Sequence, residues 1–191
     1  MPEDRCFRIT EDDIDELKDR TRDQLLIEAY KRWVDKFAPK LDQIIGEVRT
    51  AFHGVQLGEG IGLFEAKGLD DFASDEERVE LRAKDEKHDW QRISPTDLAR
   101  CSAAPFFFDL AGFIFHLPAF LIAELNDEHP YGFIDRLCRF DVLPKGWHEL
   151  LTMTQRNAIA LALIMVTEHP DYSTNQTKLQ EVIRKLETGV A

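Results

Sequence analysis

The sequence has few cysteines and lacks the cysteine spacing of metal and redox motifs. Its three cysteines, Cys6, Cys101 and Cys138, lie far apart, and no Cys-x-x-Cys pair occurs. A zinc knuckle and a dithiol redox motif are therefore excluded, because both need closely spaced thiols. Three unpaired cysteines fit a reducing compartment, so we expect a cytoplasmic protein.

Long apolar runs and recognisable catalytic motifs are also lacking. Residues 1–7 have none of the apolar character of a secretory signal, and the apolar run 158–166 is too short to cross a bilayer. We therefore expect a soluble protein without membrane contact. No serine stands in a Gly-x-Ser-x-Gly context, and no glycine-rich turn carries the Lys-Ser/Thr of a phosphate loop. No cofactor is expected.

Positive charge is scarce. The chain has 24 Lys and Arg against 36 Asp and Glu, a net charge of -12, and residues 51–100 alone hold 12 acidic and 7 basic side chains. Such a surface repels phosphate, so nucleic-acid binding is not expected. The same charge can steer a basic protein into contact. The alternative is an acidic surface that only faces solvent and binds no partner.

Helical periodicity dominates the first part of the chain. Thr10 and Asp13 have capping-box spacing, and apolar residues then recur at helical intervals as far as Phe37. We expect residues 1–38 to form an N-terminal helical arm and residues 39–191 an α-rich globular domain. The apolar stripe of residues 10–38 suits either packing on that domain or a homodimer contact.

The acidic middle of the chain begins with a glycine-rich turn. A short helix is expected over 63–66, closed by Gly68 in a left-handed conformation, and Ser74 caps a charged helix expected over 75–90. On that second helix Asp85, His88 and Asp89 would share one face, which we interpret as solvated.

The most apolar stretch of the chain is Phe106–Leu125. Its order of residues predicts a strand, a tight turn, a second strand and a helix. Asp109 and Gly112 suit the turn, because Asp bonds turn backbone and Gly accepts positive φ. Pro118 suits the first position of the helix. The expected fold class is α+β, mostly α, with about seven helices, a small β-hairpin near residues 106–116 and a strand or loop at 140–143.

Three segments have a distinctive order of residues. They are the Gly-Glu-Gly-x-x-Leu-x-Glu-Ala segment 58–66 with its continuation to Phe72, the segment Leu81–Trp90, and the Phe-His-Leu-Pro-Ala-Phe-Leu segment that ends at Leu121. Together they resemble a bacterial family defined only as a domain of unknown function. The resemblance implies a fold boundary that leaves residues 1–38 outside, and it implies no activity.

His116 is the candidate functional group inside the apolar stretch. With Glu65 it is a candidate for acid–base catalysis, and with Glu59 and Asp70 it is a candidate for binding a hard cation. Either role requires the acidic turn 59–71 to reach His116 in space. The alternative is a structural histidine bonded to backbone, beside carboxylates that only cap helices or face solvent.

The absence of a catalytic constellation favours a non-catalytic interaction module. Its role would be immunity-like or regulatory binding of a basic protein partner. One alternative is a metal-dependent or acid–base hydrolase that uses His116 with Glu59, Glu65 or Asp70. The other is a structural homodimer formed through residues 10–38.

Overall fold

Helices are the regular elements of the chain wherever the structure describes it. The structure is a computed structural model, and it describes residues 7–128, 132–139 and 143–189. The α-helices are α1 (Glu11–Arg20), α2 (Gln24–Lys36), α3 (Leu41–Ala51), α4 (Leu63–Asp70), α5 (Asp75–Lys84), α6 (Pro95–Arg100), α7 (Leu110–Leu125), α8 (Phe133–Leu137), α9 (Met153–Thr167) and α10 (Gln176–Thr188). Short 3-10 helices include η2 (Trp90–Arg92), η3 (Ala104–Phe106) and η4 (Pro170–Asn175).

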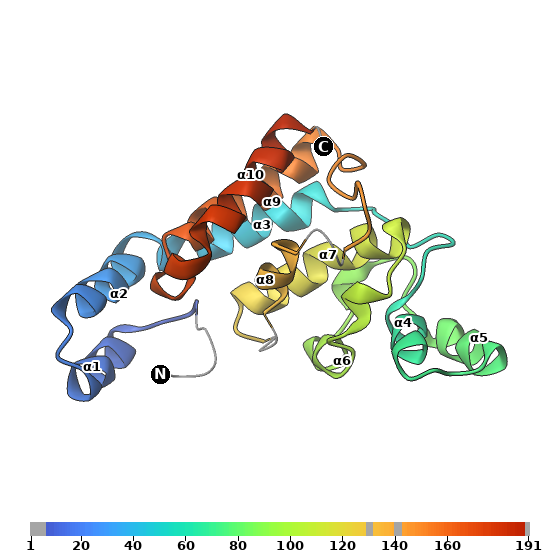
Figure 1. The fold of residues 1–191 in the computed structure, drawn as a ribbon, viewed down its shortest axis with the longest axis horizontal. Helices are drawn as coiled ribbons and strands as arrows, with labels where there is room; N and C mark the ends of the chain where they lie inside the picture. The colour runs from blue at the N-terminus through green and yellow to red at the C-terminus, as the bar shows by residue number, and fades with distance from the viewer. Residues whose placement is uncertain (1–6, 129–131, 140–142, 190–191) are drawn as a thin grey trace.

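Helices from distant parts of the chain pack side by side. α9 contacts both α3 and α10, and the three run together along the upper part of Figure 1. α7 packs on α3 and also contacts α6, α8 and η2. The pairs α1–α2 and α4–α5 lie at opposite ends of the long axis in Figure 1. α7 therefore sits between the long helices and the short elements around α6 and α8.

The α7 helix is central because it is apolar on every side. From Phe115 to Leu125 all of its residues are buried, and Phe113 is buried as well. Asp109 begins the helix: its Oδ1 accepts a hydrogen bond from the Gly112 N–H at 2.8 Å. This bond satisfies one of the amides that a helix N-terminus leaves without a partner.

The expected hairpin at residues 106–116 is wrong, and with it the α+β class. The described residues contain no strand, and Asp109 and Gly112 start a helix where a turn was expected. Gly112 does not have a positive φ, and Pro118 lies inside the helix and not at its start. A helix buried on all sides has no polar face, so its pattern cannot be told from that of buried strands. Helices also outnumber the expected seven.

The N-terminal residues are packed onto the rest of the chain by an aromatic cluster. Phe7 and Trp33 are fully buried, and the Trp33 indole donates a hydrogen bond to the Phe7 carbonyl at 3.0 Å. Trp33 meets His169 with ring centroids 4.5 Å apart, and Phe7 stacks on Tyr172 at 5.7 Å. These contacts join α2 to η4. The division of the chain into an arm of residues 1–38 and a domain of residues 39–191 stays a prediction.

A glycine loop connects α3 to α4 and contacts the start of α7. The Asp109 Oδ1 that caps α7 also accepts from the Ile61 N–H at 3.0 Å. A Cβ atom at Gly112 would overlap the Ile61 carbonyl oxygen, and one at Gly60 would lie 2.7 Å from the Gly112 nitrogen. The two backbones approach closely only because both residues are glycines.

The strand or loop expected at residues 140–143 falls mostly on residues 140–142, which lie outside the described residues. None of the helices in the described part of the chain combines the length and apolar character that crossing a membrane requires.

The close approach at Gly112 makes a direct prediction about stability. Gly112→Ala should lower the free energy of unfolding by about 1–3 kcal/mol, because the added methyl group forces the loop away from α7. Gly46→Ala is the matched control: it lies in α3, a Cβ there meets nothing within 4 Å, and the change should raise stability by about 0.5–1 kcal/mol. Urea unfolding measures both, and equal effects would contradict the packing argument.

Candidate functional site

His116 lies in the second turn of α7 and is 1% exposed. Its Nδ1 is 2.7 Å from the carbonyl oxygen of Gly112, one turn earlier. The ring stacks on Phe108, with centroids 4.4 Å apart and an interplanar angle of 7°, and meets Phe115 edge-on. The side chain is thus held in one orientation by a hydrogen bond and two aromatic contacts.

The hydrogen bond of His116 fixes which ring nitrogen carries the proton. A carbonyl oxygen can only accept, so Nδ1 donates and Nε2 keeps a lone pair. Nε2 is buried and has no hydrogen-bond partner among the described residues. Burial lowers the pKa of His116 to about 4, so the ring is neutral near pH 7. The result is a buried acceptor without a donor.

Asp85 directly follows α5 and caps α4 from outside. Its carboxylate accepts from the backbone N–H groups of Phe64 at 2.6 Å and Glu65 at 3.3 Å. The N-cap residue of α4 is Gly62, which has no side chain to do this, and a Cβ there would overlap the Asp85 carboxylate. Asp85 is 8% exposed, and burial raises its pKa to about 6.

Asp85 and His116 line the same cavity, which has a volume of about 250 Å³ and which we call the His116 cavity. Its apolar walls are Leu63, Phe64 and Ile93, and four charged residues complete the lining: Lys84, Glu86, Arg92 and Asp97. The two most buried polar groups of the lining are therefore a neutral imidazole and a carboxyl group.

Of the predicted site residues, only His116 lines this cavity. Glu65 pairs with Arg82, Oε2 to Nη1 at 2.7 Å, and the fully exposed Glu59 lies 3.4 Å from Nη2 of the same guanidinium. Asp70 is the last residue of α4. Among the described residues that line the His116 cavity, none of the three appears. Glu59 and Glu65 are brought together by Arg82, and not by His116.

Sequence reasoning missed Asp85 because it placed the residue on a solvated helix face. The charged helix was expected to reach Trp90, but α5 ends at Lys84 and residues 85–89 turn back toward α4. In that turn Glu86 accepts from three successive backbone N–H groups, which lowers its pKa. The signal that was available is Gly62, a helix start without a capping side chain, which needs a carboxylate from elsewhere.

The described residues offer no group of three or more His, Cys, Asp or Glu side chains placed to hold a metal ion. The candidate cation ligands Glu59, Asp70 and His116 in particular do not form such a group.

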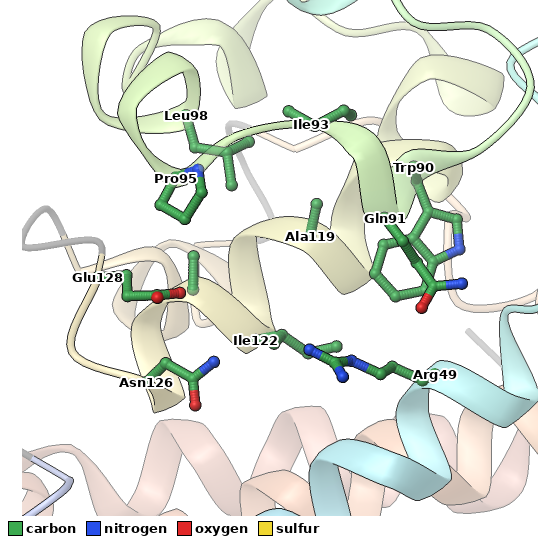
Figure 2. A pocket seen from close by; sticks show the side chains of 11 residues that line it. Arg49, Trp90, Gln91, Ile93, Pro95, Leu98, Ala119, Ile122, Asn126 and Glu128 are labelled. Atoms are coloured by element: carbon green, nitrogen blue, oxygen red, sulfur yellow. The ribbon is translucent and has the colours of Figure 1, made fainter.

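A smaller cavity of about 150 Å³ shares Ile93 with the His116 cavity as a lining residue. Figure 2 shows Trp90 and Arg49 at one side of it, Asn126 and Glu128 at the other, and Ala119 and Ile122 of α7 between them. The indole N–H of Trp90 is satisfied by the Phe52 carbonyl at 2.9 Å. Because this cavity has no orphaned buried group of the His116 kind, the His116 cavity is the candidate ligand site.

A second feature is the pair of helices α4 and α5, residues 63–84, which we call the acidic hairpin. The turn between the two helices is exposed. Phe72 follows the end of α4 with φ 57°, and it is 95% exposed. The N–H of Phe72 bonds to the Leu69 carbonyl at 3.3 Å, and that of Ala73 to the Gly68 carbonyl at 2.8 Å. This is a Schellman motif, in which the left-handed position is usually glycine.

Acidic side chains surround Phe72. Residues 70–80 contain six acidic residues and one basic residue. Asp71 pairs with Lys67 at 2.5 Å and Asp75 with Arg78, whereas the exposed Glu76 and Glu80 have no cationic partner in the described chain. Val79, on α5, is 69% exposed. The hairpin therefore presents exposed apolar side chains inside a negatively charged surface.

The model of one protein family matches the chain over residues 40–187, and that family is described as a family of unknown function, DUF6714. The chain belongs to the DUF6714 family. The DUF6714 match begins after the predicted arm and contains the glycine loop, the acidic hairpin and the whole lining of the His116 cavity. No curated protein and no solved structure matches the chain. Membership confirms the expected resemblance and assigns no activity.

The two buried groups of the His116 cavity contribute oppositely to the pH dependence of stability. Asp85 has a pKa of about 6 in the fold against an ordinary 3.8, so its contribution to the free energy of unfolding falls as the pH rises through this interval. His116 has a pKa of about 4 against an ordinary 6.5, so its contribution falls as the pH drops through this interval. The two effects largely cancel where the intervals overlap.

Single variants should separate these contributions. With Asp85→Asn, the stability advantage of the unsubstituted protein over the variant should be larger at pH 4 than at pH 7. With His116→Phe, that advantage should be smaller at pH 4 than at pH 7. Urea unfolding at pH 4, 5, 6 and 7 measures both differences. A difference that stays constant over this range for either variant would contradict the burial-shifted pKa of that residue.

Proposed function

We propose that this chain is a cytoplasmic, non-catalytic interaction module that binds a basic protein partner through the acidic hairpin. Its role would be immunity-like, masking a basic surface of the partner, or regulatory. The single observation that carries the proposal is Phe72, a large apolar side chain that is 95% exposed at a backbone position with φ 57°.

Phe72 is unfavourable for the free protein in two ways. A left-handed backbone costs a non-glycine residue about 1–2 kcal/mol, and glycine would satisfy the same Schellman motif without that cost. In addition, the ring gains nothing from burial within its own chain. A partner that covers the ring would recover this apolar surface, and aromatic side chains are enriched among the residues that dominate binding energies.

The surrounding charge defines the chemistry of the partner. The acidic side chains of residues 70–80 favour a positively charged surface and speed its approach. A basic surface with an apolar recess for Phe72 would match both properties of the hairpin. Charge alone would give loose attraction, whereas the ring supplies a specific anchor.

The alternatives have less support from the geometry. A hydrolase of this kind would use His116 with Glu59, Glu65 or Asp70, yet none of these three lines the His116 cavity, and Glu59 and Glu65 pair with Arg82. The homodimer idea relied on the apolar stripe of residues 10–38. Two residues of that stripe, Ile14 and Trp33, are buried within the chain itself.

The proposal predicts that stability and binding respond oppositely at Phe72. Phe72→Gly should raise the free energy of unfolding by about 1 kcal/mol, because it relieves the left-handed strain. The same variant should bind the partner about 30-fold more weakly, as expected for loss of an interface anchor worth ~2 kcal/mol. Urea unfolding measures the first effect, and titration against a partner isolated on the unsubstituted protein measures the second.

Leu25→Ala is the matched control, since Leu25 is 80% exposed on α2 and outside the hairpin. This variant should retain binding. Raising the salt concentration should weaken binding of the unsubstituted protein, because the attraction is between exposed charges. If Phe72→Gly and Leu25→Ala capture the same proteins with the same affinity, the hairpin is not the binding surface and the proposal fails.

A further inference from the structure

We propose that the His116 cavity receives the ammonium or guanidinium end of a lysine or arginine side chain from the basic partner. This inference rests on the proposed function, and it assigns a second contact to the same hairpin. The observation that motivates it is the buried Nε2 of His116, which has no partner among the described residues.

Hydrogen-bonding chemistry selects a ligand that donates. His116 uses its one N–H on the Gly112 carbonyl, so only the lone pair of Nε2 is left for a ligand. The other deeply buried polar group of the lining is the Asp85 carboxylate, which also accepts. An anionic ligand would find no donor on these two groups and would be repelled by Asp85. A protonated amine or guanidinium donates to both.

Charge favours the same ligand. Asp85 accepts two backbone N–H bonds, but it forms an ion pair with none of the described cationic side chains. A buried carboxylate without a counter-charge is costly. A cation entering the cavity would supply the counter-charge, and its hydrogen bonds would be strengthened by the low dielectric of the buried site.

Two cations line the cavity without opposing this assignment. Arg92 lies 3.6 Å from Glu86, Nε to Oε2, and its side chain is 72% exposed. Lys84 is exposed at the end of α5. Both can extend into water, whereas Asp85 and His116 cannot. The lining as a whole holds three carboxyl groups, on Asp85, Glu86 and Asp97, against these two cations.

The shape of the cavity suits a long side chain with a charged end. Leu63, Phe64 and Ile93 provide apolar walls for the methylene stem. The volume of about 250 Å³ far exceeds the roughly 10–15 Å³ that a single water molecule needs on a comparable measure. A bound water alone would therefore leave most of the space unfilled.

The position of the cavity lets one partner reach both contacts. Asp85 caps the N-terminus of α4, and Phe72 follows its C-terminus. The eight residues of α4 span about 12 Å at 1.5 Å per residue. This separation is well within a protein–protein interface of ordinary size. The partner would thus contact the acidic hairpin at both ends of α4.

The test uses side-chain mimics on the complete chain at pH 7.5. The probes are N-acetyl-lysine amide and N-acetyl-arginine amide, with N-acetyl-norleucine amide as the neutral control and N-acetyl-glutamate amide as the anionic control. The readout is the ¹⁵N chemical shift of His116 Nε2, which reports directly when that lone pair accepts a hydrogen bond. We expect a saturable shift with one or both cationic probes and none with the controls.

Variants identify the site. His116→Phe keeps an aromatic ring beside Phe108 and removes the Nε2 acceptor, and Asp85→Asn keeps the size of the side chain and removes its negative charge. Each variant should weaken cationic-probe binding about tenfold or more. Amide chemical shifts of Phe64 and Glu65 follow binding in the His116 variant. Saturable binding of the anionic or neutral probe in preference to the cationic ones, or no shift with any probe, overturns the inference.

The partner experiment separates the two proposals. If Phe72→Gly loses the partner and His116→Phe binds it as the unsubstituted protein does, the proposed function stands and the inference about the cavity fails. If neither variant affects capture, the proposed function fails, and probe binding at His116 would then mark a site for free amines, which overturns the assignment to a partner side chain. Loss of affinity in both variants supports both proposals.

Discussion

The Asp109 carboxylate holds together the two parts of the chain on which the candidate site depends. One of its oxygens accepts from the Gly112 N–H and starts α7, and the same oxygen accepts from the Ile61 N–H of the glycine loop. With the loop fixed there, Gly62 meets Asp85, and Asp85 in turn caps α4. His116 lies one turn after Gly112 on the helix that Asp109 begins. The positions of both Asp85 and His116 in the cavity therefore depend on the two hydrogen bonds that Asp109 Oδ1 accepts.

Local signals predicted where capped helices start better than they predicted the central element. The capping residues Thr10 and Ser74 both act as predicted, because a cap depends on residues within one turn. The prediction for the segment 106–125 was wrong because α7 is buried on all sides. Such burial removes the polar–apolar periodicity that distinguishes a helix from a strand. The same Asp and Gly side chains can close a hairpin or begin a helix.

The candidate site was predictable only in part. His116 was found because a polar residue in an apolar stretch is conspicuous in any sequence. Its partner in the cavity was not found, since Asp85 reaches α4 through a turn that ends α5 earlier than its charged pattern indicates. Phe72 was also missed: Gly68 was expected to end the helix, but α4 continues through it, and the left-handed position falls on a phenylalanine instead. Both depend on how far a helix extends, which propensity determines poorly.

The two ends of the segment 57–87 are tied to each other. The Leu57 N–H donates to the Lys87 carbonyl at 2.9 Å, and Arg82 donates to the Gly60 carbonyl at 2.8 Å. With the Asp85–Phe64 bond, these contacts close a loop that contains the whole acidic hairpin. Such a segment is suited to open and close as one cooperative unit, separately from the packing of α3, α9 and α10. A ligand seated against Asp85 would then slow hydrogen exchange throughout the hairpin, while the amides of the long helices would keep their own rates.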